Sequence, residues 1–171
     1  MLQQQCQSLG YNLESVFLVK NETKEDYSIK MRNFLTKYKN NGIWGVGFGD
    51  IFLEEIRKYR LEHLSLLNMQ GVFPLWKRNT LEIANSFIDL GFKAIVVCVD
   101  SKFLNKKFIG RRFDHNFLAD LPANIDPCGE NGEFHTFVSE GPVFKYPIKY
   151  KKGRVIFRDS RFYYCDLIPV I

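Results

Sequence analysis

The sequence lacks the two glycine-rich motifs by which α/β proteins most often bind nucleotides. Neither GxGxxG nor GxxxxGK[ST] occurs in its 171 residues, which excludes a standard dinucleotide-binding turn and a Walker A loop. It also lacks an apolar run near the roughly 20 residues that a membrane-spanning helix needs. The longest such run, Ala94 to Val99, has the length of a strand. We therefore expect no membrane partner.

Cysteine is scarce, and its spacing excludes the common zinc motifs. The four cysteines form no CxxC pair, so reduced thiols in the cytoplasm are the simplest expectation. The first residues carry neither a basic patch nor a long apolar core, so no secretory signal is visible. With 46% hydrophobic residues, the chain can still bury a substantial core.

Acidic residues are scarce only near the C-terminus. The formal net charge is +5, and between residues 145 and 161 the only acid is Asp159. Such an excess permits an anionic partner, including RNA held by Lys151, Lys152 and Arg154. A solvated edge hairpin, whose lysines deter aggregation, explains the same pattern. We favour the hairpin, so nucleic acid is not the expected partner.

Helical and strand-like patterns alternate between Leu2 and Asp100. Thr23 is a candidate helix cap, and Asn79 with Glu82 resembles a capping box. Helices are predicted at residues 2–9, 24–39, 54–67 and 79–90. Strands or extended segments are predicted at residues 13–19, 43–48, 72–76 and 93–99. This alternation predicts an α/β core with parallel pairing, and the β-branched run 93–99 suits a parallel strand covered on both faces.

Beyond Asp100 the pattern is weaker. Residues 114–121 are compatible with one short helix. Residues 154–157 and 162–167 predict a β-hairpin around Asp159 and Ser160. The C-terminal part is therefore expected to be a smaller α+β region that ends in a hairpin.

The densest chemical segment runs from Asp126 to Val138. It combines two glycines, two glutamates, a cysteine and a histidine, and then continues into an apolar, strand-like tail. A thiol–imidazole pair or a metal site is conceivable at Cys128 and His135, but two ligands are too few for zinc. We interpret Cys128 as packed and His135 as hydrogen-bonded beside the loop. Glu130 and Glu133 remain as a candidate carboxylate pair, against the alternative of a glycine-rich turn with exposed acids.

Three motifs together carry a resemblance to a known family. They are Gly49-Asp50-Ile51, Pro74-Leu75-Trp76 and Cys128-Gly129-Glu130-Asn131-Gly132-Glu133-Phe134-His135-Thr136, followed by Gly141-Pro142. With these motifs in register over nearly the whole chain, the sequence resembles the diphthine–ammonia ligase family of PP-loop ATP pyrophosphatases. The resemblance implies a Rossmann-like (HUP-type) parallel sheet with helices on both faces. It further implies a remainder of the nucleotide-binding domain at residues 1–72 and a substrate-side domain at residues 73–171.

One family feature has no counterpart in this sequence. The family opens with a strand and an SGGKDS-type PP-loop, and no segment here matches that loop. The resemblance therefore implies an N-terminally truncated form of the fold. Two explanations remain open: a fragment of a longer protein, or a member without a PP-loop that has a binding role. In either case, unpaired strand backbone has to pair differently or find another chain, so a homo-oligomer is a further hypothesis.

The resemblance implies an ATP-dependent amide ligase that adenylates a carboxylate, releases pyrophosphate and lets ammonia displace AMP. ATP and Mg²⁺ are then the expected cofactors. For an archaeal or eukaryotic member the expected partner is elongation factor 2, whose diphthine side chain is the family's substrate. For a bacterial member it is an unknown carboxylate substrate.

The resemblance also assigns roles to residues. Gly49 and Asp50 are expected on the nucleotide side, with Asp50 a possible Mg²⁺ ligand, whereas a helix N-cap is its local alternative. Glu130 and Glu133 are expected to act in catalysis. Phe134 and Trp76 could hold the trimethylammonium group of diphthine by cation–π contact, although a core position is equally plausible for Trp76. The residues expected on the substrate side are Trp76, Cys128, Gly129, Asn131, Gly132, Phe134, His135 and Thr136.

Overall fold

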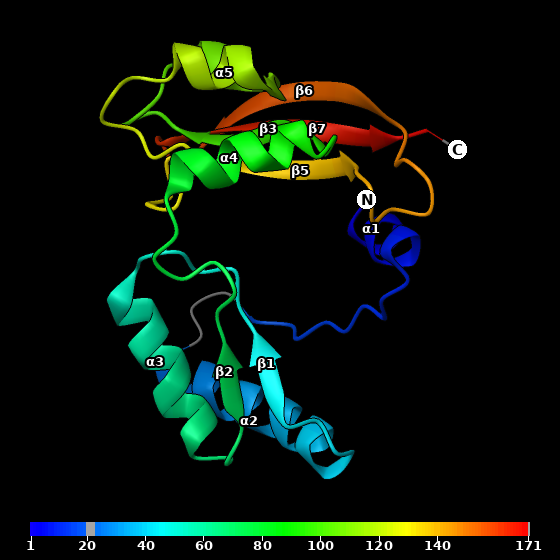
Figure 1. Ribbon diagram of the computed structural model, residues 1–171, viewed down its shortest axis with the longest axis vertical. Helices are drawn as coiled ribbons and strands as arrows, with labels where there is room; N and C mark the ends of the chain where they lie inside the picture. Colours follow the sequence, from blue (N-terminus) through cyan, green and yellow to red (C-terminus); the bar gives the residue numbers. More distant parts are fainter. Residues whose placement is uncertain (20–22, 171) are drawn as a thin grey trace. The chain divides into compact units, whose positions relative to one another are not determined.

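The computed structural model describes residues 1–19 and 23–170 and divides the chain into two compact units (Figure 1). The N-terminal unit comprises residues 14–78. The C-terminal unit comprises Asn79–Ile171 together with Met1–Leu13. The predicted division of labour between a nucleotide side and a substrate side stays a prediction, so each unit is described by itself.

The N-terminal unit is a small βαβ arrangement preceded by a helix. Its strands β1 and β2 pair in parallel, with Gly45 opposite Gln70 and Gly47 opposite Val72. Helix α3 connects them, and Ile51, Leu64 and Met69 form the buried part of the unit. Its elements are α2 (Lys24–Asn40), β1 (Gly45–Gly47), α3 (Glu54–Ser65) and β2 (Gln70–Val72). Among the described residues, the expected parallel pairing is confirmed for these two strands, and no full HUP-type sheet is formed.

The helix starts follow from capping residues that the sequence shows. Thr23 Oγ1 accepts a hydrogen bond from the Asp26 amide at 3.1 Å, and the Asp26 carboxylate accepts one from the Thr23 amide. Asn79 Oδ1 accepts a hydrogen bond from the Glu82 amide at 3.1 Å, which starts α4. Each cap satisfies amide donors that the first helical turn leaves without a partner. The predicted helices at 24–39 and 79–90 are confirmed.

The strand predicted at residues 13–19 is wrong. No described strand pairs with this segment, and most of its apolar side chains face solvent, with Phe17 83% exposed. A hydrogen bond to it comes from the Lys30 side chain, which donates to the Phe17 carbonyl at 3.0 Å. An apolar, β-branched run forms a strand only where a neighbouring strand accepts and donates its backbone hydrogen bonds.

The C-terminal unit is built on a five-stranded sheet. Its order is β4-β3-β7-β6, and β5 also pairs with β3. Its helices are α1 (Leu2–Leu9), α4 (Thr80–Asp89), the 3₁₀ helix η1 (Lys106–Phe108) and α5 (His115–Asp120). Its strands are β3 (Lys93–Asp100), β4 (Arg112–Phe113), β5 (Phe134–Glu140), β6 (Tyr150–Arg158) and β7 (Phe162–Pro169). The predicted hairpin is confirmed as β6 and β7, and both of its turn residues, Asp159 and Ser160, have positive φ.

Strand β3 is central and buried as predicted, but the predicted parallel pairing of this run is wrong. β3 runs antiparallel to β4, β5 and β7. Only Lys93 and Val97 among its residues are not buried. A continuous β-branched run reports that both faces of a strand are covered, and it carries no information about the direction of the neighbours.

The core of this unit lies between the sheet and the helices α4 and α5. Figure 1 shows both helices against the sheet. Phe117 of α5 packs edge-on against Phe134 of β5, with ring centroids 5.2 Å apart, and Phe113 lies beside both. Ala84 of α4 and Val96 of β3 join the same cluster. This packing fixes the start of β5, which directly follows residues 126–133.

Helix α1 is joined to this unit by a buried serine. Ser8 Oγ donates to the Tyr146 carbonyl at 2.5 Å and accepts from the Tyr146 amide at 3.1 Å. The Gln5 side chain donates to the Val138 carbonyl at the end of β5. Gly10 ends the helix in the left-handed conformation. No helix in the described residues is both long and apolar enough to cross a membrane.

Candidate functional site

The acidic loop, residues 126–133, is shaped by two carboxylates that bind its own backbone. The first is Asp126, whose Oδ2 accepts hydrogen bonds from the amides of Cys128 at 3.0 Å and Glu130 at 2.9 Å. An aspartate that binds amides two and four residues later closes a tight turn without help from a neighbouring strand. The backbone of Glu130 is therefore fixed, and its side chain is partly exposed.

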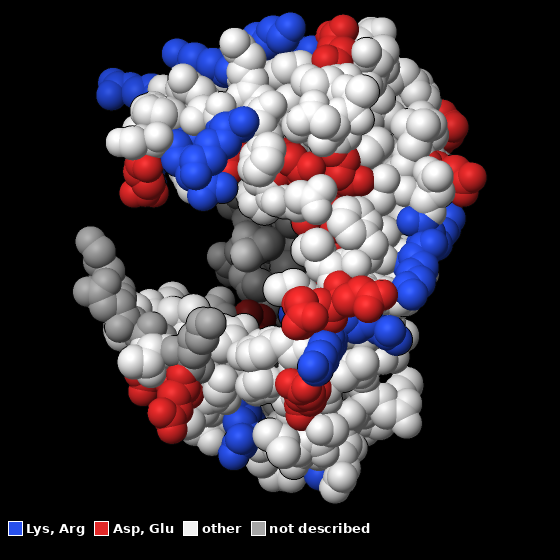
Figure 2. All heavy atoms as spheres, turned by 90° about the vertical axis from the view of Figure 1, so that its left-hand side faces the viewer, with Lys and Arg blue, Asp and Glu red and all other residues white. Residues whose placement is uncertain are grey.

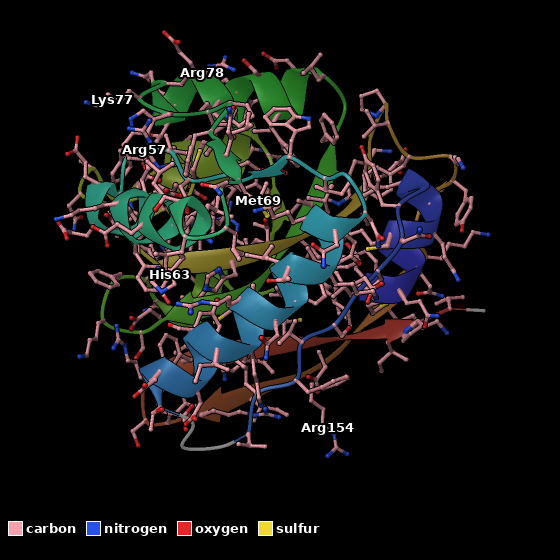
Figure 3. The ribbon with its side chains drawn as sticks, turned by 90° about the horizontal axis from the view of Figure 1, so that it is seen from below. Arg57, His63, Met69, Lys77, Arg78 and Arg154 are labelled. Carbon is pink, nitrogen blue, oxygen red and sulfur yellow. The ribbon has the colours of Figure 1, made fainter. Side chains whose placement is uncertain are left out.

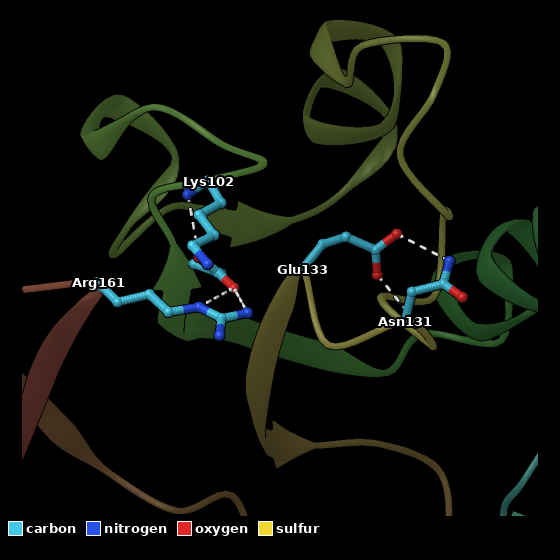
Figure 4. A network of polar contacts seen from close by, with 5 residues as sticks. Lys102, Asn131, Glu133 and Arg161 are labelled. Atoms are coloured by element: carbon cyan, nitrogen blue, oxygen red, sulfur yellow. Dashed lines mark hydrogen bonds and ion pairs between the residues drawn. The ribbon is translucent and has the colours of Figure 1, made fainter. Parts of the chain in front are cut away.

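The second carboxylate is Glu133, and it is buried. Its side chain is 2% exposed and accepts three hydrogen bonds, which come from the Asp126 amide at 3.1 Å and from the Asn131 amide and side-chain nitrogen at 3.0 Å each. Figure 4 shows the two contacts with Asn131. The alternative of a glycine-rich turn with two exposed acids is therefore wrong for Glu133, and a catalytic role for the pair stays a prediction. Glu133 holds the loop together from the inside, and Glu130 is the acid at its surface.

Two glycines allow the loop to take this path. Gly129 and Gly132 both have positive φ, at 70° and 84°, a region that L side chains rarely adopt. A Cβ at Gly129 would also lie 2.7 Å from the Phe134 carbonyl oxygen. Position 129 therefore requires glycine for two reasons, which are its positive φ and the lack of space for a Cβ beside the Phe134 carbonyl.

A second buried carboxylate lies beside the loop at the end of β3. Asp100 is 1% exposed, and its amide donates to the Glu133 carbonyl at 2.9 Å. Its side chain accepts from Arg161 Nε at 2.7 Å and from the Lys102 amide at 2.9 Å (Figure 4). The Arg161 hydrogen bond holds the pKa of Asp100 below its ordinary value. Asp100 and Glu133 therefore meet where β3 ends and β5 begins.

Arg161 and Asp126 are parts of this arrangement that the sequence did not identify. Arg161 directly precedes β7. Its backbone carbonyl accepts a hydrogen bond from the Ser101 amide at 2.9 Å, and this contact brings Arg161 close to Asp100. It lies 61 positions from its partner. For Asp126, the Asp-Pro-Cys-Gly sequence is a recognisable turn signal that points to an aspartate cap.

The remaining predicted substrate-side residues of the C-terminal unit divide between core and surface. Phe134 is 2% exposed and packs against Phe113 and Phe117, so its ring is closed to a substrate cation. His135 and Thr136 are exposed on β5. The hydrogen bond expected for the His135 ring is not found among the described residues. Contact of the His135 and Thr136 side chains with a substrate stays a prediction.

Cys128 is held as a neutral thiol. Its Sγ donates to the Thr80 carbonyl at 3.2 Å. Burial, followed by the charges of Asp126 and Glu130, raises the pKa of Cys128 to about 12. Because the thiolate is the reactive form of cysteine, this environment opposes a nucleophilic role and agrees with the predicted packed thiol.

We predict that iodoacetamide at pH 8 alkylates native Cys128 about a thousandfold more slowly than a free cysteine, because so little thiolate is present. Peptide mass spectrometry over a time course measures the rate for each cysteine. In concentrated urea, all four cysteines react at similar rates. Rapid alkylation of native Cys128 would contradict the buried, hydrogen-bonded thiol.

In the N-terminal unit, the predicted nucleotide-side aspartate is already paired. Arg60 Nε lies 2.7 Å from Asp50 Oδ2, and Arg60 Nη2 donates to Oδ1 at 3.2 Å. The Arg60 guanidinium also lies over the Phe48 ring at 4.4 Å. Asp50 is thus ion-paired with Arg60, and its role as a magnesium ligand stays a prediction. Gly49 is exposed beside it.

Trp76 forms part of a hollow of about 390 Å³ on α3. The Arg57 guanidinium lies 4.6 Å from the Trp76 ring centroid and 5.2 Å from that of Phe73. Lys77 lines the same hollow, and Figure 3 shows Arg57, Lys77 and Arg78 on one side of this unit. The Trp76 ring was predicted to bind a substrate cation. One face of this ring already contacts the Arg57 guanidinium of the same chain.

No group of three metal-ligating side chains occurs among the described residues. On the face shown in Figure 2, Lys and Arg side chains are interspersed with Asp and Glu. Lys151, Lys152 and Arg154 are exposed on β6, as a solvated hairpin requires. RNA binding through this hairpin is the less favoured alternative, and nothing in the structure tests it.

Comparison with known proteins identifies relatives for most of the chain. The family of the diphthamide synthase C-terminal domain matches residues 79–167, all within the C-terminal unit. The diphthine–ammonia ligase of Schizosaccharomyces pombe is 27% identical over 159 residues, which cover 90% of this chain and 26% of that protein. The Bos taurus enzyme is 30% identical over 118 residues (66% and 44%), and the Homo sapiens enzyme 28% over 122 residues (68% and 45%). The matched region is thus less than half the length of each of these relatives.

Proposed function

The chain belongs to the diphthine–ammonia ligase family, and from this premise we propose that it takes part in ATP-dependent amide formation from a carboxylate and ammonia. The proposed substrate is the diphthine side chain of elongation factor 2 or a chemically related carboxylate. The matched region spans less than half of each of the named relatives, so the complete reaction is a proposal for this chain. The C-terminal unit supplies the ammonia side of that reaction.

The observation that carries this proposal is the fixed position of Glu130. Asp126 binds the Glu130 amide on one side, and Glu133 binds the Asn131 amide on the other. The loop therefore presents one partly exposed carboxylate on a backbone that is held from within. A preorganised carboxylate at a surface is what binding and deprotonating a small cation requires.

Amide formation gives Glu130 a definite task. Ammonium has no lone pair for attack, so one proton must leave first, and a Glu130 oxygen accepts it. The free nitrogen then attacks the acyl carbon of the adenylate. The bond from that carbon to the adenylate oxygen breaks, AMP leaves, and the nitrogen loses a second proton to give the amide. The Glu133 carboxylate binds groups of the loop, so Glu133 acts as a positioning residue.

The N-terminal unit is proposed to contact the nucleotide. A Cβ at Gly47 or Gly49 would meet nothing within 4 Å, so a ligand can approach this backbone closely. Arg57 Nε is buried and has no hydrogen-bond partner among the described residues. An anionic group of ATP, bound as substrate, would supply that acceptor. Asp50, which is ion-paired with Arg60, stays the candidate ligand for Mg²⁺.

We predict that Glu130→Gln slows amidation about 100-fold, which is at the lower end of the rate loss expected when a general base is removed. The assay supplies diphthine-bearing elongation factor 2, ATP, Mg²⁺ and ¹⁵N-ammonium, and mass spectrometry counts ¹⁵N in the product. Glutamine keeps the backbone amide that binds Asp126, and thermal denaturation verifies that the variant is folded.

The matched control is Glu82→Gln, which alters an exposed acid on α4 and should leave turnover unchanged. Wild-type turnover in Glu130→Gln would remove Glu130 from the reaction. If the unaltered chain incorporates no ¹⁵N from this mixture, the proposal that the chain itself forms the amide is refuted.

A further inference from the structure

A hollow of about 630 Å³ opens in the C-terminal unit at the end of the sheet where β3 begins and β5 ends. The acidic loop lies at the opposite end, because Lys93 pairs with Glu140 whereas Val99 pairs with Phe134. At about 3.3 Å per residue, β3 separates the two ends by roughly 23 Å. No part of the proposed amidation chemistry reaches this hollow.

The interior of the hollow is apolar. Side chains from α4, the start of β3, β4 and the segment before β6 line it, namely Ile88, Phe92, Ala94, Phe113, Pro147 and Ile148. Its volume lies within the range of about 300–1,000 Å³ that is usual for small-molecule sites. Phe113, Ala94 and Ile148 are themselves buried, so the interior belongs to the folded core.

The walls are preformed by close packing at Gly141. A Cβ at Gly141 would lie 2.1 Å from the Phe92 ring, so only glycine lets this ring lie against the backbone. On its other side Phe92 stacks on Phe87, with centroids 4.9 Å apart and 16° between the ring planes. Gly141, part of the Gly141-Pro142 motif, thus allows the Phe92 ring to form a fixed wall of the hollow.

The rim carries an excess of positive charge. Arg112 and Lys149 line the hollow, and neither side chain has a polar partner among the described residues. Lys93 is paired with Glu140 at 2.9 Å. Asp114, the other acid at the rim, accepts a hydrogen bond from the Phe117 amide at 2.8 Å and caps α5. Two cations therefore remain available to an anion.

A second hollow of about 320 Å³ adjoins the first and shares Arg112 and Tyr150 with it. Its other lining residues include Lys152, whose amine donates to the Gly110 carbonyl at 3.4 Å. Arg112 consequently lies where the two hollows meet, with apolar surface on one side and further positive charge on the other.

We propose that this hollow is a binding site for a small amphiphilic anion. The apolar body of the ligand lies against Phe92 and Phe113, and its carboxylate, sulfonate or phosphate group pairs with Arg112 and Lys149. Apolar burial supplies most of the affinity, whereas the guanidinium selects for negative charge. This site is independent of the acidic loop and of the amidation proposed for it.

A pair of fluorescent probes tests both halves of the proposal. Anilinonaphthalene sulfonate carries the negative charge, and N-phenyl-1-naphthylamine is its neutral counterpart. We expect one sulfonate probe to bind per chain, and Arg112→Gln to weaken its binding about tenfold, as loss of a charged hydrogen bond predicts. Binding of the neutral probe should stay within a factor of two. Arg154→Gln is the matched control, since Arg154 is exposed and extends away from the ribbon in Figure 3.

A filling variant locates the bound probe. Ile88→Trp places an indole at the hollow and should abolish binding of both probes, while circular dichroism verifies that the variant is folded. Glu130→Gln should bind the sulfonate probe as the unaltered chain does, which separates this site from the amidation site. The proposal is overturned if Arg112→Gln binds the sulfonate probe with unchanged affinity, or if folded Ile88→Trp still binds it.

Discussion

Replacing Arg161 with methionine will lower the free energy of unfolding of the C-terminal unit by about 3 kcal/mol. The Asp100 carboxylate is buried and receives the Arg161 guanidinium at 2.7 Å. Removal of one partner from a buried ion pair leaves an uncompensated charge and costs about 3–5 kcal/mol. Because the Arg161 side chain is 40% exposed, we expect the lower end of this range.

The destabilisation will depend on pH in a defined direction. Arg161 holds the pKa of Asp100 below its ordinary value in the folded protein. A carboxyl group of this kind contributes stability above its unfolded pKa of about 3.9, and that stability is lost as the pH falls through the folded pKa. The difference between the variant and the unaltered chain should be full at pH 7 and should shrink below about pH 4.

The two units can be followed separately. Both tryptophans, Trp44 and Trp76, lie in the N-terminal unit, so their fluorescence in urea reports on that unit. Hydrogen exchange of β3 peptides reports on the C-terminal unit, because β3 is its central strand. Arg161→Met should accelerate exchange in β3 and leave the tryptophan transition in place.

Two comparisons decide whether the ion pair is responsible. Arg154→Met removes an exposed arginine from β6 and should change the stability by less than about 0.5 kcal/mol. Asp100→Asn combined with Arg161→Met should cost less than the sum of the single variants, because asparagine leaves no buried charge. Equal effects of Arg161→Met and Arg154→Met would show that Asp100 is compensated by other groups.

Helix positions followed from the sequence because their determinants are local. Thr23 and Asn79 bind amides three residues away, and Gly10 ends α1 within its own turn. The hairpin of β6 and β7 was predictable for the same reason, since Asp159 and Ser160 tolerate the positive φ that its turn requires.

Strand pairing did not follow from the sequence, because it depends on distant segments. The run in β3 correctly indicated burial on both faces, but its neighbours β5 and β7 are antiparallel. Residues 13–19 have the same apolar, β-branched character, yet no described strand pairs with them. A strand needs backbone partners, and a short apolar run does not specify where these partners are.

The acidic loop was recognisable from composition, whereas the separate roles of its acids were not. Glu130 and Glu133 are three residues apart in a glycine-rich segment, and nothing local separates them. Glu133 is buried at the point where β3 meets β5, and its backbone carbonyl there accepts a hydrogen bond from the Asp100 amide. That juxtaposition joins segments 33 positions apart, so only the folded chain assigns the inside and the outside of the loop.

Replacing Glu133 with alanine should therefore have a different signature from replacing Glu130. Three loop hydrogen bonds to the Glu133 carboxylate would be lost. Each unsatisfied buried donor costs about 1–3 kcal/mol, and partial hydration of an opened loop reduces the sum. We expect a destabilisation of about 3–4 kcal/mol, with accelerated hydrogen exchange at Asp126 and Asn131 measured by NMR.

Glu133→Gln is the informative intermediate. Glutamine keeps the size of the side chain and one accepting oxygen. Its NH₂ group, however, faces an N–H donor from which the second glutamate oxygen accepts a hydrogen bond. It should lie between alanine and the unaltered chain in stability, and it should lose amidation to the extent that the loop loses order. Glu130→Gln should lose amidation with the loop intact. Normal stability and normal loop exchange in Glu133→Ala would contradict the positioning role, and would return Glu133 to consideration as a group that contacts the substrate.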